Sequence, residues 1–248
     1  MRKIIKRMQS DSLVIIPTYN EAENIRMILD SIFGLDYAFH VLIVDDNSPD
    51  GTAQMVKECQ SEYQERLHLL SRKEKMGLGT AYIAGFKWAL ARDYAYIFEM
   101  DADFSHNPED LPRLLSACKN DGADMSIGSR YVTGVNVVNW PMTRVMLSWI
   151  ASKYVRLITR MKIHDTTAGF VCYKRKVLET INLDKVQFVG YAFQIEMKFK
   201  AYEKGFKIIE VPVIFTDRTR GESKMSQKII SEAIFGVIKL KFKSLFSK

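Results

Sequence analysis

Short apolar segments that end in polar or acidic residues alternate with amphipathic segments through the first half of this 248-residue chain. The apolar segments lie at 13–16, 41–44, 67–70 and 95–100. Apolar runs of this length between turn residues are typical of buried strands. Strands that alternate with helices predict a mostly parallel sheet with helices on both faces. Because no internal repeat or low-complexity linker interrupts the pattern, we predict one α/β domain over residues 1–225.

The second half of the chain has a less regular pattern. Apolar and polar periodicity predicts helices over 142–161, 190–203 and 227–246, and strands over 166–173 and 207–216. Pro212 lies inside the last of these strands, so this strand is predicted to be bulged or at an edge of the sheet. The final helix, within 226–248, is amphipathic and rich in lysine.

The strand at 95–100 runs directly into two carboxylates, Asp101 and Asp103. Side chains at i and i+2 leave an extended chain on the same side, at the edge where open α/β sheets bind ligands. Like charges this close raise each other's pKa unless a cation lies between them. Oxygen ligands suit Mg²⁺ or Mn²⁺ that holds a substrate diphosphate. The alternative is a solvated acidic turn, since 107–109 is typical of a helix start.

Two other polar clusters follow predicted strands and should reach the same edge of the sheet. Asn20 with Glu23 resembles a capping box, which would explain the Asn20-Glu21 cluster structurally. Capping does not explain the consecutive acids Asp45 and Asp46, so we interpret that pair as functional.

A set of cations that could bind phosphate follows later in the sequence: Arg130, Arg144, Arg218, Arg220 and Lys224. Arginine matches phosphate oxygens with two donors, and lysine acts as a point charge. The segment 217–226 could close on a phosphate or could be a solvated basic loop. An acidic pair and distributed cations together predict either one substrate with two phosphates or two phosphorylated substrates.

Charge and cysteine content indicate which partners the protein could bind and in which redox state its thiols are. The formal net charge is +7, and basic residues gather at 1–9 and 226–248, which favours a membrane surface over a nucleic-acid groove. Because no long apolar segment follows the basic residues at 1–9, we expect no secretory signal, and no window approaches the ~20 apolar residues of a membrane-spanning helix. Three widely spaced cysteines, Cys59, Cys118 and Cys172, predict reduced and buried thiols.

Eight motifs occur in order from about residue 12 to residue 225. They are IPTYNE (16–21), VDDNSPDGT (44–52), GLGTA (77–81), MDADFSH (100–106), GSRY (128–131), NWP (139–141), AGF (168–170) and RTRGESK (218–224). With these motifs the chain resembles the family 2 glycosyltransferases with the GT-A fold, and among them the polyprenyl-phosphate (dolichol-phosphate) mannose synthases. It departs from the family at Ala168, where serine is common, and at Phe104, where leucine is common.

The resemblance implies the following site residues. The nucleotide sugar would be bound by Pro17, Tyr19, Glu21, Val44, Asp46, Asp101, Ala102, Asp103, Arg218 and Lys224. The metal, Mg²⁺ or Mn²⁺, would be held by Asp103, Ser105 and Asp101. The acceptor phosphate would be bound by Ser129, Arg130 and Arg144. The catalytic set would be Asp101, Asp103, Arg130 and Arg218.

The resemblance also implies a reaction: transfer of mannose from GDP-mannose to polyprenyl phosphate with inversion, or of glucose or another hexose from a UDP-sugar. A lipid phosphate, with a second pKa of roughly 6, can attack without a strong base. His106, beside a helix start, is therefore interpreted as structural. The protein would be peripheral at the cytoplasmic face of a membrane. The helix within 226–248 would lie on the bilayer or pack on the domain, and the need for a membrane subunit stays open.

Three other classes fit less well. A nicotinamide dehydrogenase would carry G-x-G-x-x-G after a strand, and 77–79 lacks the third glycine. A haloacid-dehalogenase-type phosphatase would also use D-x-D, but earlier in the chain and with threonine at the position of Ser105. A basic nucleic-acid-binding module would show exposed aromatic residues among its cations, and the sequence lacks such a motif.

Overall fold

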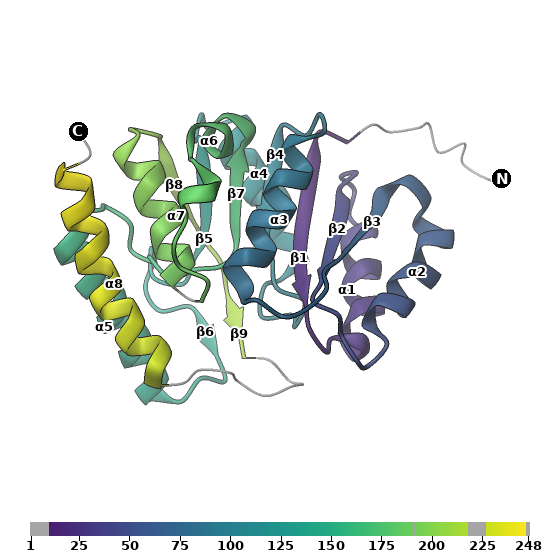
Figure 1. Ribbon diagram of the computed structural model, residues 1–248, viewed down its shortest axis with the longest axis horizontal. Helices are drawn as coiled ribbons and strands as arrows, with labels where there is room; N and C mark the ends of the chain where they lie inside the picture. The colour runs from purple at the N-terminus through teal and green to yellow at the C-terminus, as the bar shows by residue number, and fades with distance from the viewer. Residues whose placement is uncertain (1–9, 191, 218–226, 247–248) are drawn as a thin grey trace.

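The computed structural model describes residues 10–190, 192–217 and 227–246 (Figure 1). The strands are β1 (Ser12–Thr18), β2 (His40–Asp45), β3 (Leu67–Ser71), β4 (Tyr96–Glu99), β5 (Met125–Ser129), β6 (Val137–Val138), β7 (Val171–Lys174), β8 (Ile208–Pro212) and β9 (Phe215–Thr216). The α-helices are α1 (Ala22–Phe33), α2 (Thr52–Tyr63), α3 (Leu78–Leu90), α4 (Leu111–Lys119), α5 (Met142–Thr159), α6 (Arg175–Thr180), α7 (Ala192–Glu203) and α8 (Gln227–Phe246).

The main sheet has seven strands in the order β3-β2-β1-β4-β7-β5-β8. Every pair of neighbours is parallel except those made by β7, which is antiparallel to both β4 and β5. The predicted mostly parallel sheet is therefore confirmed. β8, which contains Pro212, is an edge strand, as the proline predicted.

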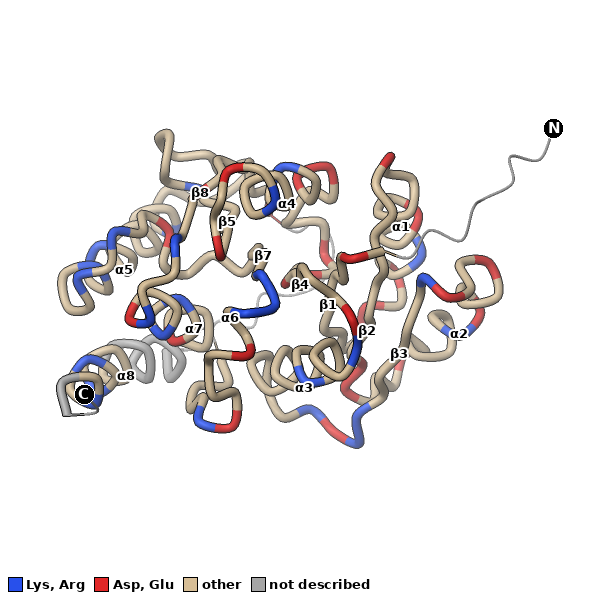
Figure 2. The backbone as a smooth tube through the Cα atoms, turned by 90° about the horizontal axis from the view of Figure 1, so that it is seen from above, with Lys and Arg blue, Asp and Glu red and all other residues tan. Residues whose placement is uncertain are grey.

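Helices cover both faces of this sheet. Figure 2 shows α1 and α4 on one side and α3 and α8 on the other. Alternate residues of β1 pack on opposite faces of the sheet. Leu13 and Ile15 belong to the core that also contains residues of α3, and Val14 and Ile16 belong to the core that contains residues of α1 and α4. All four side chains are fully buried. The continuous apolar run at 13–16 thus reflects a strand that is buried on both faces.

The carboxyl ends of β1, β2, β3, β4, β5 and β8 lie at one edge of the sheet, the lower edge in Figure 1. Because β7 runs the other way, Val171 at its amino end pairs with Glu99 at the end of β4. The segment 165–170, which precedes β7, therefore reaches the same edge. The small ribbon of β6 and β9 lies beside it.

The start of α1 differs from the prediction, because Asn20 does not cap the helix. The N-cap position is Glu21, and Asn20 takes a left-handed backbone conformation with φ 59°. The backbone N–H groups at the start of α1 donate instead to side chains just before and at the start of α2. Asp50 Oδ2 accepts from the Ala22 N–H at 3.0 Å, and Thr52 Oγ1 accepts from the Glu21 N–H at 3.1 Å. The capping-box prediction was wrong, because a neighbouring loop supplies the cap.

The predicted final helix is present as α8, which packs on the domain through Val237 and Leu240. Phe235 and Phe242 on the same helix stay exposed. Within the three described ranges, no helix is long and apolar enough to cross a membrane. Cys59, Cys118 and Cys172 are all free and buried, as predicted.

Gly79 in the first turn of α3 offers a test of the packing. A Cβ atom there would lie 2.7 Å from the Phe188 carbonyl oxygen and 2.8 Å from the Phe193 ring. We expect Gly79→Ala to lower the free energy of unfolding by about 1–3 kcal/mol, because overpacking outweighs the gain in helix propensity. Urea unfolding measures this change. Gly190→Ala is the control, since a Cβ at Gly190 meets nothing within 4 Å and should change stability by less than about 0.5 kcal/mol.

Candidate active site

The D-x-D sequence forms a compact loop after β4. Asp101 Oδ1 accepts a hydrogen bond from the Tyr82 hydroxyl at 3.4 Å, and Asp103 Oδ1 accepts from the Ser105 N–H at 3.1 Å. The Asp101 N–H donates to His106 Nδ1 at 3.1 Å. These contacts hold the loop so that both carboxylates sit at the carboxyl edge of the sheet, as the sequence predicted.

His106 has a structural part in this loop. The ring is buried, stacks on Phe170 with centroids 5.0 Å apart, and meets Phe215 edge-on at 5.6 Å. Burial lowers the pKa of His106 to about 4, so the ring is neutral near pH 7. A neutral imidazole that accepts a backbone hydrogen bond through Nδ1 orders the Asp101 loop, which is the structural role expected of His106.

The oxygen atoms of this loop fit a hard divalent cation. Ser105 Oγ is buried and has no hydrogen-bond partner among the described residues. Beside it lie the carboxylates of Asp101 and Asp103. In the described ranges, no group of three or more His, Cys, Asp and Glu side chains forms a complete metal site. A cation such as Mg²⁺ commonly takes only one or two carboxylates and completes its shell with substrate phosphates and water.

The two consecutive acids after β2 have separate roles. Asp45 is buried, and its carboxylate accepts from the hydroxyls of Thr18 at 3.0 Å and Ser48 at 2.6 Å, which ties the ends of β1 and β2 together. Asp46 pairs instead with Arg72, with Nε and Oδ1 3.2 Å apart. Burial raises the pKa of Asp46, and Arg72 opposes that rise. The two acids predicted as a functional pair thus have different partners, and a binding role for Asp46 stays a prediction.

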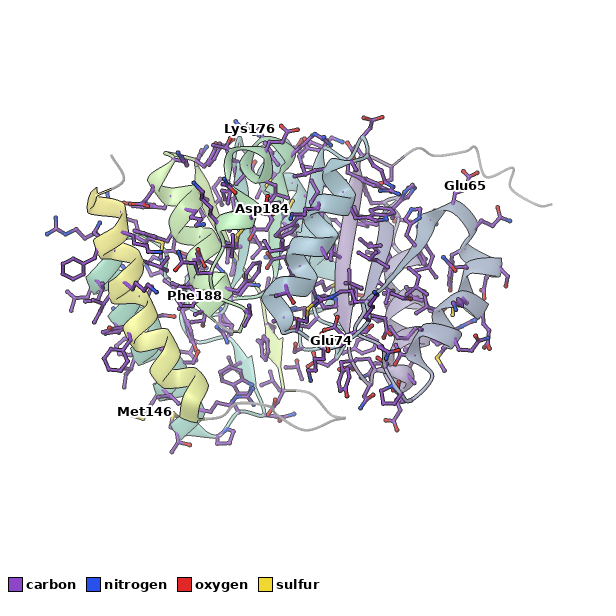
Figure 3. The ribbon with its side chains drawn as sticks, viewed as in Figure 1. Glu65, Glu74, Met146, Lys176, Asp184 and Phe188 are labelled. Atoms are coloured by element: carbon purple, nitrogen blue, oxygen red, sulfur yellow. The ribbon has the colours of Figure 1, made fainter. Side chains whose placement is uncertain are left out.

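Arg72, the partner of Asp46, is a residue at this edge of the sheet that the sequence analysis missed. Its Nη2 donates to Thr80 Oγ1 at 2.7 Å, while its buried Nη1 has no hydrogen-bond partner within the described part of the chain. Lys75, in the same loop, lies 4.1 Å from the centroid of the Tyr19 ring. Glu74 marks this loop at the lower edge in Figure 3. Arg72 directly follows β3, so the rule that pointed to the other strand ends would also have found it.

The remaining nucleotide-site predictions are distributed as follows. Glu21, at the N-cap of α1, accepts from Asn24 Nδ2 at 2.8 Å. Pro17 is in β1 and Ala102 is buried in the D-x-D loop. Val44 has a side chain that is fully buried in the core and a backbone that pairs with β1 and β3, and its predicted contact with the nucleotide sugar stays a prediction. Arg218 and Lys224, and Arg220 with them, lie outside the described residues.

Arg130 is the centre of the predicted acceptor site. Its Nε donates to Asp165 Oδ2 at 2.7 Å, its Nη2 donates to Asp165 Oδ1 at 2.6 Å, and Nη2 also donates to Thr167 Oγ1 at 2.9 Å. Asp165 is fully buried. Burial alone would raise the pKa of Asp165, but the Arg130 charge and hydrogen bonds outweigh it and hold that pKa below its ordinary value.

Trp140 brings the second predicted arginine close to the first. The Arg130 guanidinium lies 5.4 Å from the Trp140 ring, and the Arg144 guanidinium lies 4.1 Å from it. Arg144, in the first turn of α5, also donates to both carboxylate oxygens of Asp217, at 2.8 and 2.9 Å. Two guanidinium groups therefore contact one indole ring, and each is held in place by a carboxylate, Asp165 for Arg130 and Asp217 for Arg144.

Ser129, also predicted to bind the acceptor phosphate, has a hydroxyl group that is engaged by neighbouring residues. It is fully buried, donates its hydroxyl hydrogen bond to Glu210 Oε1 at 2.7 Å, and accepts from the Tyr131 N–H at 3.3 Å. Glu210 further accepts from the N–H groups of His164 and Asp165, at 2.7 and 2.9 Å. Through Glu210, the Ser129 hydroxyl therefore supports the segment that carries Asp165.

The Arg130–Asp165 pair gives a stability prediction. Asp165→Asn leaves the buried Arg130 charge without compensation, so we expect the free energy of unfolding at pH 7 to fall by about 3–5 kcal/mol. Because the pKa of Asp165 is lowered by folding, its contribution is present above the unfolded carboxyl pKa and is lost as the pH falls through the folded one. Urea unfolding at several pH values measures both effects, and an equal loss in the exposed control Asp121→Asn would contradict them.

Comparison with known proteins places the chain in a family. The model of "Glycosyl transferase family 2" matches residues 13–181. The chain is 49% identical over 226 residues to the polyprenol monophosphomannose synthase of Mycolicibacterium smegmatis, covering 91% of this chain and 85% of that protein. It is 46% identical over 225 residues to the undecaprenyl-phosphate mannosyltransferase of Micrococcus luteus, covering 91% of each.

Solved structures share the fold at low sequence identity. Glucosyl-3-phosphoglycerate synthase from Mycobacterium tuberculosis, in complex with Mn²⁺, uridine diphosphate and glucosyl-3-phosphoglycerate, superposes with a TM-score of 0.67 at 16% identity over 94% of this chain and 79% of that chain. A mannosyltransferase from Pyrobaculum calidifontis, in complex with GDP-Man and Mn²⁺, gives 0.60 at 18% identity over 97% and 75%. These matches confirm the predicted GT-A fold. By its family model and its relatives, the chain belongs to glycosyl transferase family 2.

Proposed function

We propose that the protein transfers mannose from GDP-mannose to the phosphate of a polyprenyl phosphate, with inversion at the anomeric carbon. One observation carries the proposal: a single edge of the sheet holds the Asp101 and Asp103 carboxylates and, across the segment 165–170, two guanidiniums on Trp140. Such an edge suits a nucleoside diphosphate with its cation on one side and a phosphate on the other. The names of the two relatives at 46–49% identity support this substrate pair.

The donor side is formed by residues that follow β1 to β4. In our proposal Asp46 and Arg72 bind the nucleoside, with Tyr19 and Glu21 near them. Asp103, Ser105 and Asp101 would hold a divalent cation, Mg²⁺ or Mn²⁺, which when bound neutralises charge on the diphosphate leaving group. Arg218 and Lys224 are proposed to bind that diphosphate as well, because their charges suit its oxygens.

The acceptor side supplies alignment and charge. A phosphate monoester with a second pKa of roughly 6 is largely ionised at neutral pH, so it needs no strong base. Arg130 and Arg144 are proposed to hold this phosphate in line with the anomeric carbon, and such alignment is a large part of what an enzyme contributes. His106 is unsuited to be a base, because its pKa is about 4 and its Nδ1 already accepts from Asp101.

The reaction can be tested by the transfer of radiolabelled hexose to polyprenyl phosphate in detergent, from GDP-mannose and from UDP-glucose, with Mn²⁺ or Mg²⁺. We expect transfer from GDP-mannose that is abolished by EDTA. Asp103→Ala should lower the rate by about 100-fold or more, because charge on the leaving group is no longer compensated. The exposed Glu109→Ala is the matched control.

Each other outcome of this assay has a defined meaning. Transfer only from UDP-glucose would keep the mechanism and replace the donor with the UDP-hexose alternative. Full transfer by Asp103→Ala or in EDTA would contradict the role given to the D-x-D loop. Transfer from neither donor would contradict the proposed function.

The acceptor's apolar chain implies a membrane surface, and α5 with α8 offers one. Large apolar side chains are exposed along α5 and at two positions of α8: Met142, Met146, Leu147, Trp149, Ile150, Leu157, Phe235 and Phe242. Ser152, Val155 and Thr159 are buried on the opposite side of α5. Met146 lies near the lower end of α5 in Figure 3, close to the edge that holds the site. We infer a peripheral location at the cytoplasmic face of a membrane, with both helices at the surface.

Membrane binding can be tested with Met146→Glu/Leu157→Glu, which places charge at two exposed apolar positions of α5. Since burying each apolar side chain contributes about 1.5–3 kcal/mol, we expect binding to anionic lipid vesicles to weaken by about tenfold or more. Transfer in detergent should be unchanged. Vesicle co-sedimentation measures the binding, Met27→Glu on α1 is the control, and equal binding by all three proteins would contradict the inference.

A further inference from the structure

Lys198, on α7, is a fully buried lysine outside the groups discussed so far. Lysine is almost never fully buried unless its charge is paired. Its Nζ donates to the Ala168 carbonyl oxygen at 2.6 Å, and to the carbonyl and Oε1 of Gln194, both at 3.3 Å. An ammonium has three donors, and here each finds an acceptor. Lys198 is therefore a fully satisfied cation inside the protein.

The charges that face Lys198 come from both halves of the site. Glu99 and Asp165 attract it, Arg130 repels it, and Glu210 attracts it more weakly. Glu99 ends β4, two residues before Asp101, and accepts from the Tyr173 hydroxyl at 2.9 Å and from Gln194 Nε2. Gln194 lies between the two charges, because its Nε2 donates to Glu99 and its Oε1 accepts from Lys198.

The segment 165–170 contacts both sides of the candidate active site. Asp165 at its start holds the Arg130 guanidinium on the acceptor side. Phe170 at its end stacks on His106, whose ring accepts the Asp101 N–H on the donor side. Ala168, between them, is the residue whose carbonyl Lys198 binds. A single buried cation thus anchors the middle of the segment that spans the two substrate sites.

We propose that Lys198 is a positioning residue for sugar transfer, because its ammonium fixes the segment 165–170 and thereby the orientation of Arg130 relative to the D-x-D loop. The inference rests on the proposed function, since Arg130 is taken to hold the acceptor phosphate. Lys198 touches neither substrate. Its effect is on the relative placement of donor and acceptor.

The principal variant is Lys198→Met, which keeps the length of the side chain and removes its three hydrogen bonds. We expect kcat/KM for polyprenyl phosphate to fall by about 100-fold, since small misplacement of reacting groups costs about that factor. The dissociation constant of GDP, measured by titration calorimetry without acceptor or divalent cation, should change by less than about threefold. Without the cation, GDP binding depends on the proposed nucleoside-binding pair Asp46 and Arg72, which the described contacts of this segment do not include. The wild type, assayed in parallel, separates this inference from the proposed function.

Two further variants distinguish positioning from charge balance. Lys200→Met, two residues along α7, removes an ion pair with Glu196 at 3.1 Å and a bond to the Lys185 carbonyl, and should leave transfer unchanged. Lys198→Met/Glu99→Gln removes the buried cation and a buried anion together. This double variant should recover the thermal midpoint lost in Lys198→Met but keep the low kcat/KM for the acceptor.

The outcomes are decisive in each direction. Recovery of both the thermal midpoint and kcat/KM in Lys198→Met/Glu99→Gln would overturn the proposal, because charge balance alone would then explain Lys198. Unchanged transfer by Lys198→Met in an active wild-type background would also overturn it. A loss of GDP binding equal to the loss of kcat/KM would overturn it too, since a general structural defect would then account for both. An inactive wild type would refute the proposed function instead.

Discussion

The antiparallel insertion of β7 between β4 and β5 determines how the site is built. In a wholly parallel sheet every strand would contribute its carboxyl end to the ligand edge. Because β7 runs the other way, its amino end meets the ends of β4 and β5, and the segment before it enters the same edge. That segment carries Asp165 and ends in Phe170, so it joins the acidic loop after β4 to the arginine after β5.

Charge pairing is the second constraint on this edge. Most of its cations and anions are arranged as partners: Asp46 with Arg72, Asp165 with Arg130, and Asp217 with Arg144. Pairing lowers the desolvation cost of each charge, and it also fixes the direction in which each guanidinium points. The acidic loop adds two further carboxylates, which accept hydrogen bonds from neutral groups: Asp101 from the Tyr82 hydroxyl and Asp103 from the Ser105 N–H. A divalent cation is the partner that its oxygen atoms suit.

The sequence predicted the parts of this arrangement that follow local rules. The apolar run at 13–16 predicted a strand, and Asp101 and Asp103 after an apolar run predicted an acidic loop at a strand end. Both predictions succeed because each depends only on residues that are neighbours in the chain. Other features depend on residues tens of positions away in the chain. They are the cap of α1 by Asp50, the burial of Val44 and Ser129, and the pairing of Arg130 with Asp165. Arg72 is different: its position after β3 was a local signal that the sequence analysis did not use.

Phe188 lies against both the start of α3 and helix α8 (Figure 3). Its carbonyl oxygen would lie 2.7 Å from a Cβ at Gly79, and its ring would lie 2.5 Å from a Cβ at Gly236 on α8. Neither glycine has a side chain that could adjust, so one residue sets the spacing between the start of α3 and α8. Because protein interiors are close-packed, a residue held between two glycines in this way transmits a displacement of one helix to the other. A displacement of α8 would therefore be transmitted to the first turn of α3, which follows the loop that carries Arg72 and Lys75.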